Sequence, residues 1–420
     1  MTEASGKKAV TELALFGRPP LFAEPLHVGR STLGNRGRLL ERINEILDRR
    51  WFTNNGPCVN ELERRLEGLL GAQHVIATCN GTVALELAIR ACGLQGEVIV
   101  PAFTFVATAH ALQWQGIRPV FCDIDERTFT LDPRSIERAI TPQTTGIIGV
   151  HLWGRPCDVE GLEAVARAHG LTLLFDAAHA FGGSHRGRPI GTFGRAEVFS
   201  FHATKFVSTF EGGAVATNDA QLAAQIRLMK NFGFAGYDDV VYVGTNGKMS
   251  EISAAMGLTS LESMGEFLDA NRRNHRAYRE ALAGVPGLHL LESGDGSNAQ
   301  YAIVDVESES LGMSRDDLQQ VLWAENVLAR RYFYPGCHRM EPYRSLLPPE
   351  RWHLPVTERV AARVLSLPTG ATVTLDDVRQ VCELVRFAVR HASDIRVRLG
   401  ASVAAVGAHP PAVLRGRNGS

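Results

Sequence analysis

Short apolar runs alternate with longer segments of helical periodicity from about residue 40 to residue 265. The runs are rich in β-branched and aromatic residues, which is typical of buried strands. Segments between them, such as 39–47, carry their apolar residues on one face, as surface helices do. This alternation predicts an α/β fold with a doubly wound, mainly parallel sheet. We expect its strands at 74–79, 97–101, 119–125, 146–151, 171–176, 198–201 and 214–217.

The pattern changes after about residue 265. An Arg-rich helix at 264–282 leads into short apolar runs and two further helical segments, 314–325 and 375–391, which predict a smaller α+β domain. Residues 1 to 35 show no clear periodicity, and Gly, Pro and Arg dominate the C-terminal end. We therefore expect four parts: an N-terminal arm (1–35), a large domain (36–264), a small C-terminal domain (265–392) and a flexible tail (393–420).

Composition narrows the class of protein. The 420 residues carry a formal net charge of −1, which provides no basic field to attract nucleic acid or a membrane surface. No apolar run approaches the roughly 18 residues that span a bilayer, and we expect no signal peptide, because the first residues lack a long apolar core and a cleavage site. The seven cysteines are scattered without a CxxC pair, as in reduced proteins. We expect a cytoplasmic enzyme without a metal site.

One lysine stands out in the stretch EVFSFHATKFVSTFEGGAVATN, residues 197–218. Lys205 follows a short buried strand and lies in a loop with hydroxyl residues and glycines. The chain has only five lysines among its 44 basic residues: Lys7, Lys8, Lys205, Lys230 and Lys248. An amine can form a Schiff base and carry a proton, whereas a guanidinium cannot lose its proton. The alternative is an ordinary solvated loop lysine.

Two other strand ends carry candidate chemistry. The strand from His74 runs into a glycine turn at Gly81–Thr82 and then a helix, and free amides at such a helix start favour anions. Many α/β crossovers look similar. Asp176 ends another apolar strand, where ligands bind in parallel sheets, although a lone carboxylate there is often a cap.

These motifs, in this order, resemble the DegT/DnrJ/EryC1/StrS aminotransferases, through SFHATK and EGGA above all. The resemblance covers about residues 40 to 390 and implies fold type I with pyridoxal 5′-phosphate (PLP), held covalently by Lys205. It implies that Phe105 stacks on the pyridine ring, that Asp176 keeps the ring nitrogen protonated, and that His179 stands near the ring hydroxyl, where relatives often have Gln. The implied cofactor residues are Gly81, Thr82, Phe105, Asp176, His179, Ser200, Lys205 and Asn246.

The resemblance also implies the substrates. An amino acid, usually glutamate, donates nitrogen to a nucleotide-linked keto-sugar. HATK followed by TFEGG is most similar to enzymes that aminate the 4-position of dTDP-4-keto-6-deoxyglucose, and the YPxKNLG-type loop of the 3-amino branch is absent. Such sugars enter antibiotics or surface glycans. The implied substrate residues are Asn55, in an Asn-Gly-Pro turn that is otherwise a plain connector, and Tyr332, Tyr334 and His338 in an aromatic and basic segment.

The segment NGKMSE at 246–251 resembles the family's NxxMSE motif, in which the Asn reaches the cofactor phosphate of the partner subunit. The simpler interpretation is a helix cap. To serve its own subunit, the chain would have to fold back across the sheet edge, so we expect a homodimer with composite active sites.

Other interpretations remain at this stage. A 3-aminotransferase of a nucleotide-linked keto-sugar is one alternative, although that branch typically carries the YPxKNLG-type loop. A sugar dehydratase of this fold is another, but it replaces the lysine with histidine. An amino-acid lyase of fold type I is disfavoured by the HATK loop and the C-terminal aromatic segment. A non-catalytic regulator that senses PLP or a sugar belongs to another class, and the chain has no visible DNA-binding segment.

Overall fold

The large domain is built around one seven-stranded sheet. The computed structural model describes residues 7–294, 296–348 and 353–405. The strand order is β2-β10-β9-β6-β5-β3-β4, and β10 alone runs antiparallel to its neighbours. The mainly parallel sheet predicted from the sequence is confirmed. The strands are β2 (His74–Thr78), β3 (Glu97–Pro101), β4 (Arg118–Cys122), β5 (Thr144–Val150), β6 (Thr172–Asp176), β9 (Ala196–Ser200) and β10 (Gly213–Thr217).

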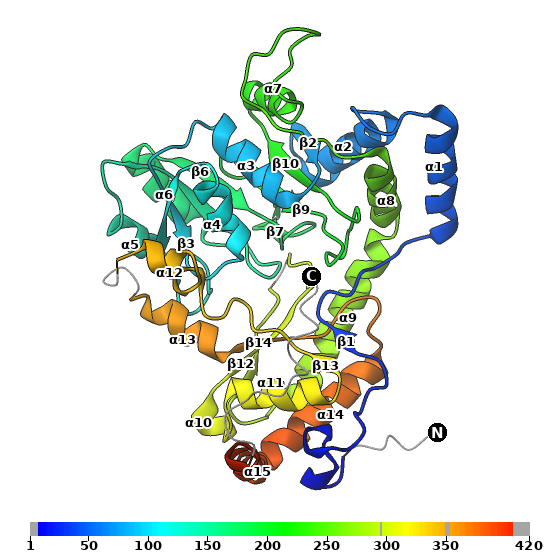
Figure 1. Cartoon of the computed structure of the whole chain (residues 1–420), viewed down its shortest axis with the longest axis vertical. Coiled ribbons are helices and arrows are strands. Elements are labelled where there is room, and N and C mark those ends of the chain that lie inside the picture. Colours follow the sequence, from blue (N-terminus) through cyan, green and yellow to red (C-terminus); the bar gives the residue numbers. More distant parts are fainter. Residues whose placement is uncertain (1–6, 295, 349–352, 406–420) are drawn as a thin grey trace.

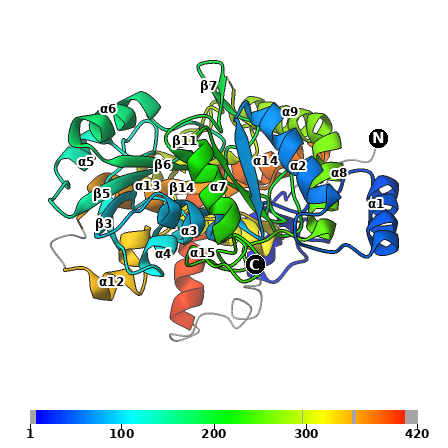
Figure 2. The ribbon, with the colours of Figure 1, turned by 90° about the horizontal axis from the view of Figure 1, so that it is seen from above.

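Both faces of this sheet are buried, which explains the continuous apolar runs. Successive residues of β6 face opposite cores: Phe175 packs with α2 (Pro57–Leu70) and α6 (Val159–His169), and Leu174 packs with α3 (Gly81–Ala91) and α4 (Val106–Gln113). The helices therefore form two layers around the sheet (Figures 1 and 2). Two further helices complete the layers: α7 (Ala220–Met229) and α8 (Glu251–Glu262).

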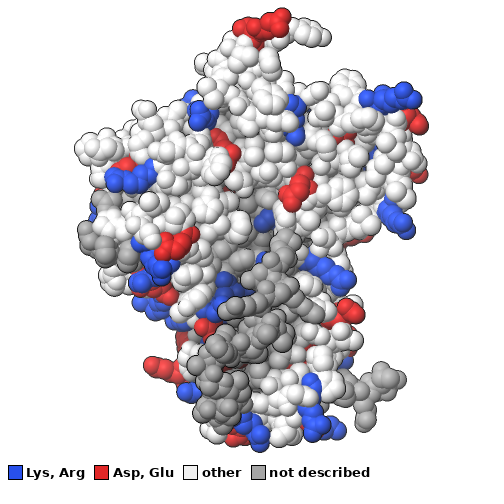
Figure 3. Space-filling view, viewed as in Figure 1, with Lys and Arg blue, Asp and Glu red and all other residues white. Residues whose placement is uncertain are grey.

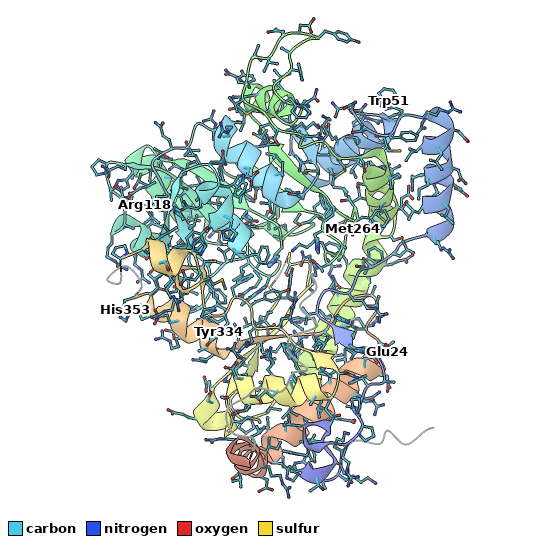
Figure 4. The ribbon with its side chains drawn as sticks, viewed as in Figure 1. Glu24, Trp51, Arg118, Met264, Tyr334 and His353 are labelled. Carbon is cyan, nitrogen blue, oxygen red and sulfur yellow. The ribbon has the colours of Figure 1, made fainter. Side chains whose placement is uncertain are left out.

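The small domain begins where α8 gives way to the long helix α9 (Met264–Leu282), at the Met264 labelled in Figure 4. Its core lies between a three-stranded antiparallel sheet and the helices α11 (Arg315–Ala324) and α14 (Leu375–Arg390). The buried Tyr278 of α9 ties the two layers, since its hydroxyl donates to the Pro368 carbonyl at 2.7 Å. The sheet consists of β11 (Leu288–Leu290), β12 (Ala302–Val306) and β14 (Val364–Leu367).

The N-terminal arm is part of the small-domain core. Leu13 is fully buried, and β1 (Leu26–His27) pairs in parallel with β13 (Val327–Leu328). The buried carboxylate of Glu325 accepts hydrogen bonds from the arm's amides at Ala14 (2.7 Å) and Leu21 (2.6 Å). The sequence shows no periodicity here because the arm contributes single apolar anchors rather than a helix face.

The C-terminal end also differs from the sequence-based expectation. A flexible tail was expected over 393–420, yet helix α15 runs from Ala392 to Ala405, and Ile395 is fully buried against the small domain. The structure has a helix where a tail was expected, because Ile395, with the partly buried Leu399 one turn further on, packs against the small-domain core. Residues 406–420 lie outside the described part of the chain.

Acidic and basic side chains are interspersed on the face drawn in Figure 3, with no broad patch of one sign. None of the helices in the described ranges has the length and apolar character needed to cross a membrane. Among the same residues, no cluster of His, Cys, Asp and Glu could hold a metal ion.

Candidate active site

A small cavity, partly open to solvent, lies at the carboxyl ends of β5 and β6. This is the edge at which parallel sheets bind their ligands. Asp176 is the last residue of β6, and Phe105 immediately precedes α4. The small domain contributes Phe333, so the cavity lies between the two domains. Its lining consists of Thr104, Phe105, Val150, His151, Asp176, Ala178, His179 and Phe333.

Asp176 is buried and held in one orientation. Its Oδ2 accepts a hydrogen bond from the Thr108 hydroxyl at 2.8 Å, and its Oδ1 accepts one from the Ala178 amide at 3.0 Å. The hydroxyls of Thr108 and Thr104 lie 2.9 Å apart, which extends the network. Thr108 was not predicted, because a threonine one turn into an apolar helix gives no signal of its partner.

Lys205 lies in the loop after β9, and backbone contacts fix that loop. Its amide donates to the His202 carbonyl at 2.8 Å, and the small-domain residue Gln300 donates its side-chain amide to the Thr204 carbonyl at 3.0 Å. Burial lowers the pKa of Lys205 to about 8, and the charge of Asp176 opposes this change. A larger share of the amine is therefore neutral and nucleophilic near neutral pH.

The other two candidate lysines of the large domain have structural contacts. Lys230 is fully buried, and its Nζ bonds to Glu63 Oε1 and the Ala77 carbonyl, each at 3.1 Å. Lys248 donates to Asn231 Oδ1 at 2.8 Å. None of the three lysines, Lys205 included, is among the residues that line the cavity. Of the three, Lys205 alone interacts electrostatically with Asp176 and His179, which do line it.

His179 forms one wall of the cavity. Its ring lies 4.6 Å from that of Tyr301 and 6.0 Å from that of Phe333. Burial, and then the charge of Lys205, hold the pKa of His179 well below its usual value, so the imidazole is neutral. Its Nδ1 is buried and has no hydrogen-bond partner within the described residues. An unsatisfied buried nitrogen of this kind is suited to a ligand.

The Gly81–Thr82 turn is a tightly packed helix start. The Asn80 side chain caps α3 by accepting from the Val83 amide at 2.8 Å, and the amides of Gly81 and Thr82 have no acceptor within their own helix. A Cβ on Gly81 would lie 3.0 Å from that of Ser200, the last residue of β9. The fold thus brings the predicted residues Gly81, Thr82 and Ser200 together.

The predicted substrate residues differ in their distance from the cavity and in their exposure to solvent. The Tyr332 ring lies 6.3 Å from that of His179, and Tyr334 is half exposed beneath the guanidinium groups of Arg331 (4.8 Å) and Arg315 (5.1 Å). Figure 4 places Tyr334 where the two domains meet. Asn55 is exposed in the turn before α2.

His338 is buried in this structure, with Nε2 3.5 Å from Glu358 Oε1. Its Nδ1 has no hydrogen-bond partner within the described residues. Its substrate role stays a prediction.

Asn246 is exposed, but its neighbour Gly247 lies on the sheet edge. The Cys79 amide donates to the Gly247 carbonyl at 2.8 Å, and Thr78 and Lys248 form a β-bridge. The chain therefore does return to the edge beside its own Gly81–Thr82 turn. This corrects the argument that a role in its own subunit would require an unusual path.

The rest of the NGKMSE segment has a structural role that the sequence only half revealed. Ser250 caps α8 by accepting from the Ser253 amide at 3.2 Å. Glu251 is fully buried, and its carboxylate accepts from the amides of Cys58 (2.8 Å) and Val59 (2.9 Å) at the start of α2. It thereby fixes the Asn-Gly-Pro turn that carries Asn55.

These residues fit PLP. Asp176 and Phe105 line the cavity: the carboxylate suits a pyridinium nitrogen, and the exposed ring of Phe105 suits stacking on the pyridine. The helix start at Gly81–Thr82, which is not among the lining residues, suits a phosphate. The unpartnered His179 and the amine of Lys205 complete the set. When bound, PLP supplies an electron sink. Fold and site together define a PLP-dependent transferase of fold type I.

Comparison with known proteins narrows the class. The family model of the DegT/DnrJ/EryC1/StrS aminotransferases matches residues 35–386, and the chain belongs to that family. It is a PLP-dependent sugar aminotransferase.

Several relatives match over most of their length. The dTDP-4-amino-4,6-dideoxy-D-glucose transaminase of Shigella dysenteriae is 38% identical over 365 residues, covering 86% of this chain and 99% of the relative. The GDP-perosamine synthase of Caulobacter vibrioides is 36% identical over 353 residues, covering 82% and 94%. Among solved structures, DesI in the presence of its TDP-sugar product has a TM-score of 0.89 and 52% identity, covering 93% and 100%.

Proposed function

We propose that the enzyme transfers an amino group, with glutamate as donor, to C4 of dTDP-4-keto-6-deoxyglucose. The observation that carries this proposal is the 52% identity, over the whole of that chain, to DesI, whose structure was determined with a TDP-sugar product. The name of the Shigella relative, a transaminase of a 4-amino-4,6-dideoxyglucose nucleotide, supports the same carbon.

The chain's own residues have defined tasks in this reaction. Lys205 moves a proton, because its lowered pKa lets the amine lose and regain one near neutral pH. Asp176, fixed by Thr108, would keep the ring nitrogen of bound PLP protonated. Neutral His179 donates or accepts one hydrogen bond through its unpartnered Nδ1.

The nucleotide sugar binds where the two domains meet. Tyr332 borders the cavity wall at His179, and Tyr334 with Arg331 offers an aromatic face and a positive charge next to it. Such a pair suits a nucleobase and a diphosphate. Asn55 contributes from the Asn-Gly-Pro turn.

The decisive experiment incubates the purified enzyme with PLP, glutamate and a panel of keto-sugar nucleotides. We expect a 4-amino product from the dTDP-4-keto-6-deoxy sugar, with 2-oxoglutarate formed in equal amount. Amination at C3, or preference for a GDP-linked sugar, would refute the substrate assignment and leave the aminotransferase class intact.

A homodimer with composite sites is the second part of the proposal. The loop between α7 and α8 projects from the large domain (Figure 1) and exposes large apolar side chains, which a second copy would cover. An isologous contact through this loop brings Asn246 to the partner's cofactor phosphate. The exposed apolar residues are Phe232, Phe234, Tyr237, Val240, Val241, Tyr242 and Val243.

The cellular role follows from the substrate. We place the enzyme in the cytoplasm, in the synthesis of a deoxyaminosugar for an antibiotic or a surface glycan. The seven free cysteines agree with a reducing compartment. Deletion of the gene should abolish the aminosugar and leave the keto-sugar nucleotide to accumulate.

A further inference from the structure

Strand β2 lies at the edge of the large sheet and leads directly into the Gly81–Thr82 turn. It pairs with β10 on one side only, so every second residue turns its amide and carbonyl away from the sheet. Such groups need partners when they are buried. Val75 and Ala77 are fully buried, and the outward groups of Val75, Ala77 and Cys79 lie on this free edge.

Side chains complete the edge in place of another strand. At Val75, the amide donates to Glu67 Oε1 at 3.2 Å and the carbonyl accepts from Arg227 at 3.4 Å. At Ala77, the amide donates to Glu63 Oε1 at 2.8 Å and the carbonyl accepts from Lys230 Nζ at 3.1 Å. We name this arrangement the edge ladder, with a Val75 rung and an Ala77 rung.

The ladder has a regular construction. Both carboxylates come from α2, one turn apart; Arg227 comes from α7, and Lys230 is the residue that caps its C-terminal end. The next outward amide along the edge, that of Cys79, has a backbone partner instead of a side chain: it donates to the Gly247 carbonyl at 2.8 Å. The ladder thus runs along β2 up to the phosphate turn.

Lys230 connects two functional segments. Its side chain bonds to Ala77, three residues before the cap of α3, and its own carbonyl accepts from the Gly247 amide at 2.9 Å. Gly247 adjoins Asn246. The Lys230 side chain is fully buried, and Glu63 Oε1, at 3.1 Å, balances its charge.

We propose that Lys230 and Glu63 are positioning residues for the cofactor phosphate. They set the end of β2, and with it the direction of the Gly81 and Thr82 amides, and they hold the Asn246 segment beside it. This inference rests on the proposed phosphate role of the turn. It assigns a task to a buried lysine outside the reaction centre.

The test compares two probes, pyridoxamine 5′-phosphate and pyridoxamine, titrated into the apo form of the full chain by calorimetry. These probes form no covalent bond with Lys205 and differ only in the phosphate. Lys230→Met should weaken binding of the phosphate probe about tenfold, the scale of one lost hydrogen bond to a charged group, and leave pyridoxamine unchanged. The proposal is overturned if Lys230→Met weakens binding of both probes equally, or changes the binding of neither.

Two matched variants sharpen the result. Glu67→Ala removes the amide acceptor of the Val75 rung, two residues further from the turn, and should change phosphate-probe binding less than about twofold. Arg227 is unsuitable for this control because it also lies 3.9 Å from Glu63 Oε2. Lys230→Met/Glu63→Gln should regain most of the affinity, because a glutamine amide can accept from the Ala77 amide and donate to its carbonyl. Failure of this rescue would count against the ladder geometry.

Failure of the ladder can be separated from failure of the turn assignment. Gly81→Ala, whose Cβ would press on Ser200, should weaken the phosphate probe. If Gly81→Ala weakens binding of the phosphate probe and Lys230→Met does not, the turn binds phosphate and only the ladder proposal is wrong. If neither variant weakens binding, the turn does not bind phosphate. If Lys230→Met does not fold, amide hydrogen exchange of the wild-type chain provides the test. The phosphate probe should slow exchange of the Ala77 amide more than pyridoxamine does. Protection confined to the Gly81 and Thr82 amides would overturn the ladder.

Discussion

The Thr108 hydroxyl donates a hydrogen bond to Asp176 Oδ2 at 2.8 Å, and Thr108 lies one turn after Phe105 on the same short segment. A single helix start therefore presents the aromatic ring to the cavity and fixes the carboxylate opposite it. The start of α4 therefore sets the position of both the Phe105 ring and the Asp176 carboxylate.

Asp176→Asn should lower kcat by on the order of a thousandfold, or about 4 kcal/mol in the barrier. The substitution keeps the shape and removes the charge that holds the ring nitrogen protonated. Thr108→Val should lower kcat about tenfold, because the carboxylate loses one of its two donors. Steady-state kinetics with the best sugar nucleotide measure both.

Asp219→Asn is the control for that comparison, since Asp219 caps α7 with its side chain and does not line the cavity. It should leave kcat within about twofold of wild type. If Asp176→Asn behaves like Asp219→Asn, the Asp176 carboxylate is only a structural cap.

Lys205→Ala should bind PLP and release no product. The wild-type protein should be yellow, with an absorbance that borohydride removes, whereas the variant should not be fixed by borohydride because the amine is missing. Lys248→Met serves as the control and should still be fixed, since Lys248 donates to Asn231 and, within the described residues, has no contact with Asp176 or His179. Full turnover by Lys205→Ala would refute the assignment.

The amine of Lys205 should react at lower pH than an ordinary lysine. Burial lowers its pKa from 10.5 to about 8, so in the apo form its labelling by an amine-reactive reagent should rise with a midpoint near pH 8. Asp176 favours the protonated amine, so Asp176→Asn should move the midpoint further down. Mass spectrometry of the Lys205 peptide follows the reaction, and a midpoint near 10.5 would contradict the burial argument.

The sequence predicted the elements whose chemistry is local. Lys205 and Asp176 follow buried strands, and Gly81–Thr82 follows another, so their positions could be inferred from the order of strands alone. The resemblance supplied the roles of Phe105 and His179, both of which line the cavity.

Partners distant in the chain could not be predicted. Thr108 with Asp176, Glu251 with Cys58, and Lys230 with Ala77 are separated by 68, 193 and 153 residues. Periodicity reports which face a residue occupies and says nothing of the residue that meets it. The resemblance, not periodicity, assigned His338 to substrate, and it gave no sign that the fold places His338 beside Glu358.

Glu251→Ala should destabilise the protein by about 3 kcal/mol, measured as the free energy of unfolding in urea at fixed protein concentration. The change leaves the amides of Cys58 and Val59 without their buried acceptor. Ser250→Ala, which removes only the cap of α8, should cost about 1 kcal/mol. Equal losses in the two variants would show that NGKMSE is only a helix cap.

Mixing two inactive variants tests the composite site. If Asn246 binds the partner's phosphate, a heterodimer of Lys205→Ala and Asn246→Asp chains has one site with both lesions and one with neither. Because the return of Gly247 to its own sheet edge allows either arrangement, the experiment is decisive.

Random exchange of chains should restore up to about a quarter of wild-type activity, since half of the dimers are mixed and each has one intact site. Mass spectrometry of the intact assembly must confirm that mixed dimers form. If they form and activity stays at the level of the separate variants, Asn246 serves its own subunit, and the exposed loop at Phe232–Val243 then has to bind a partner for another reason than completing the site.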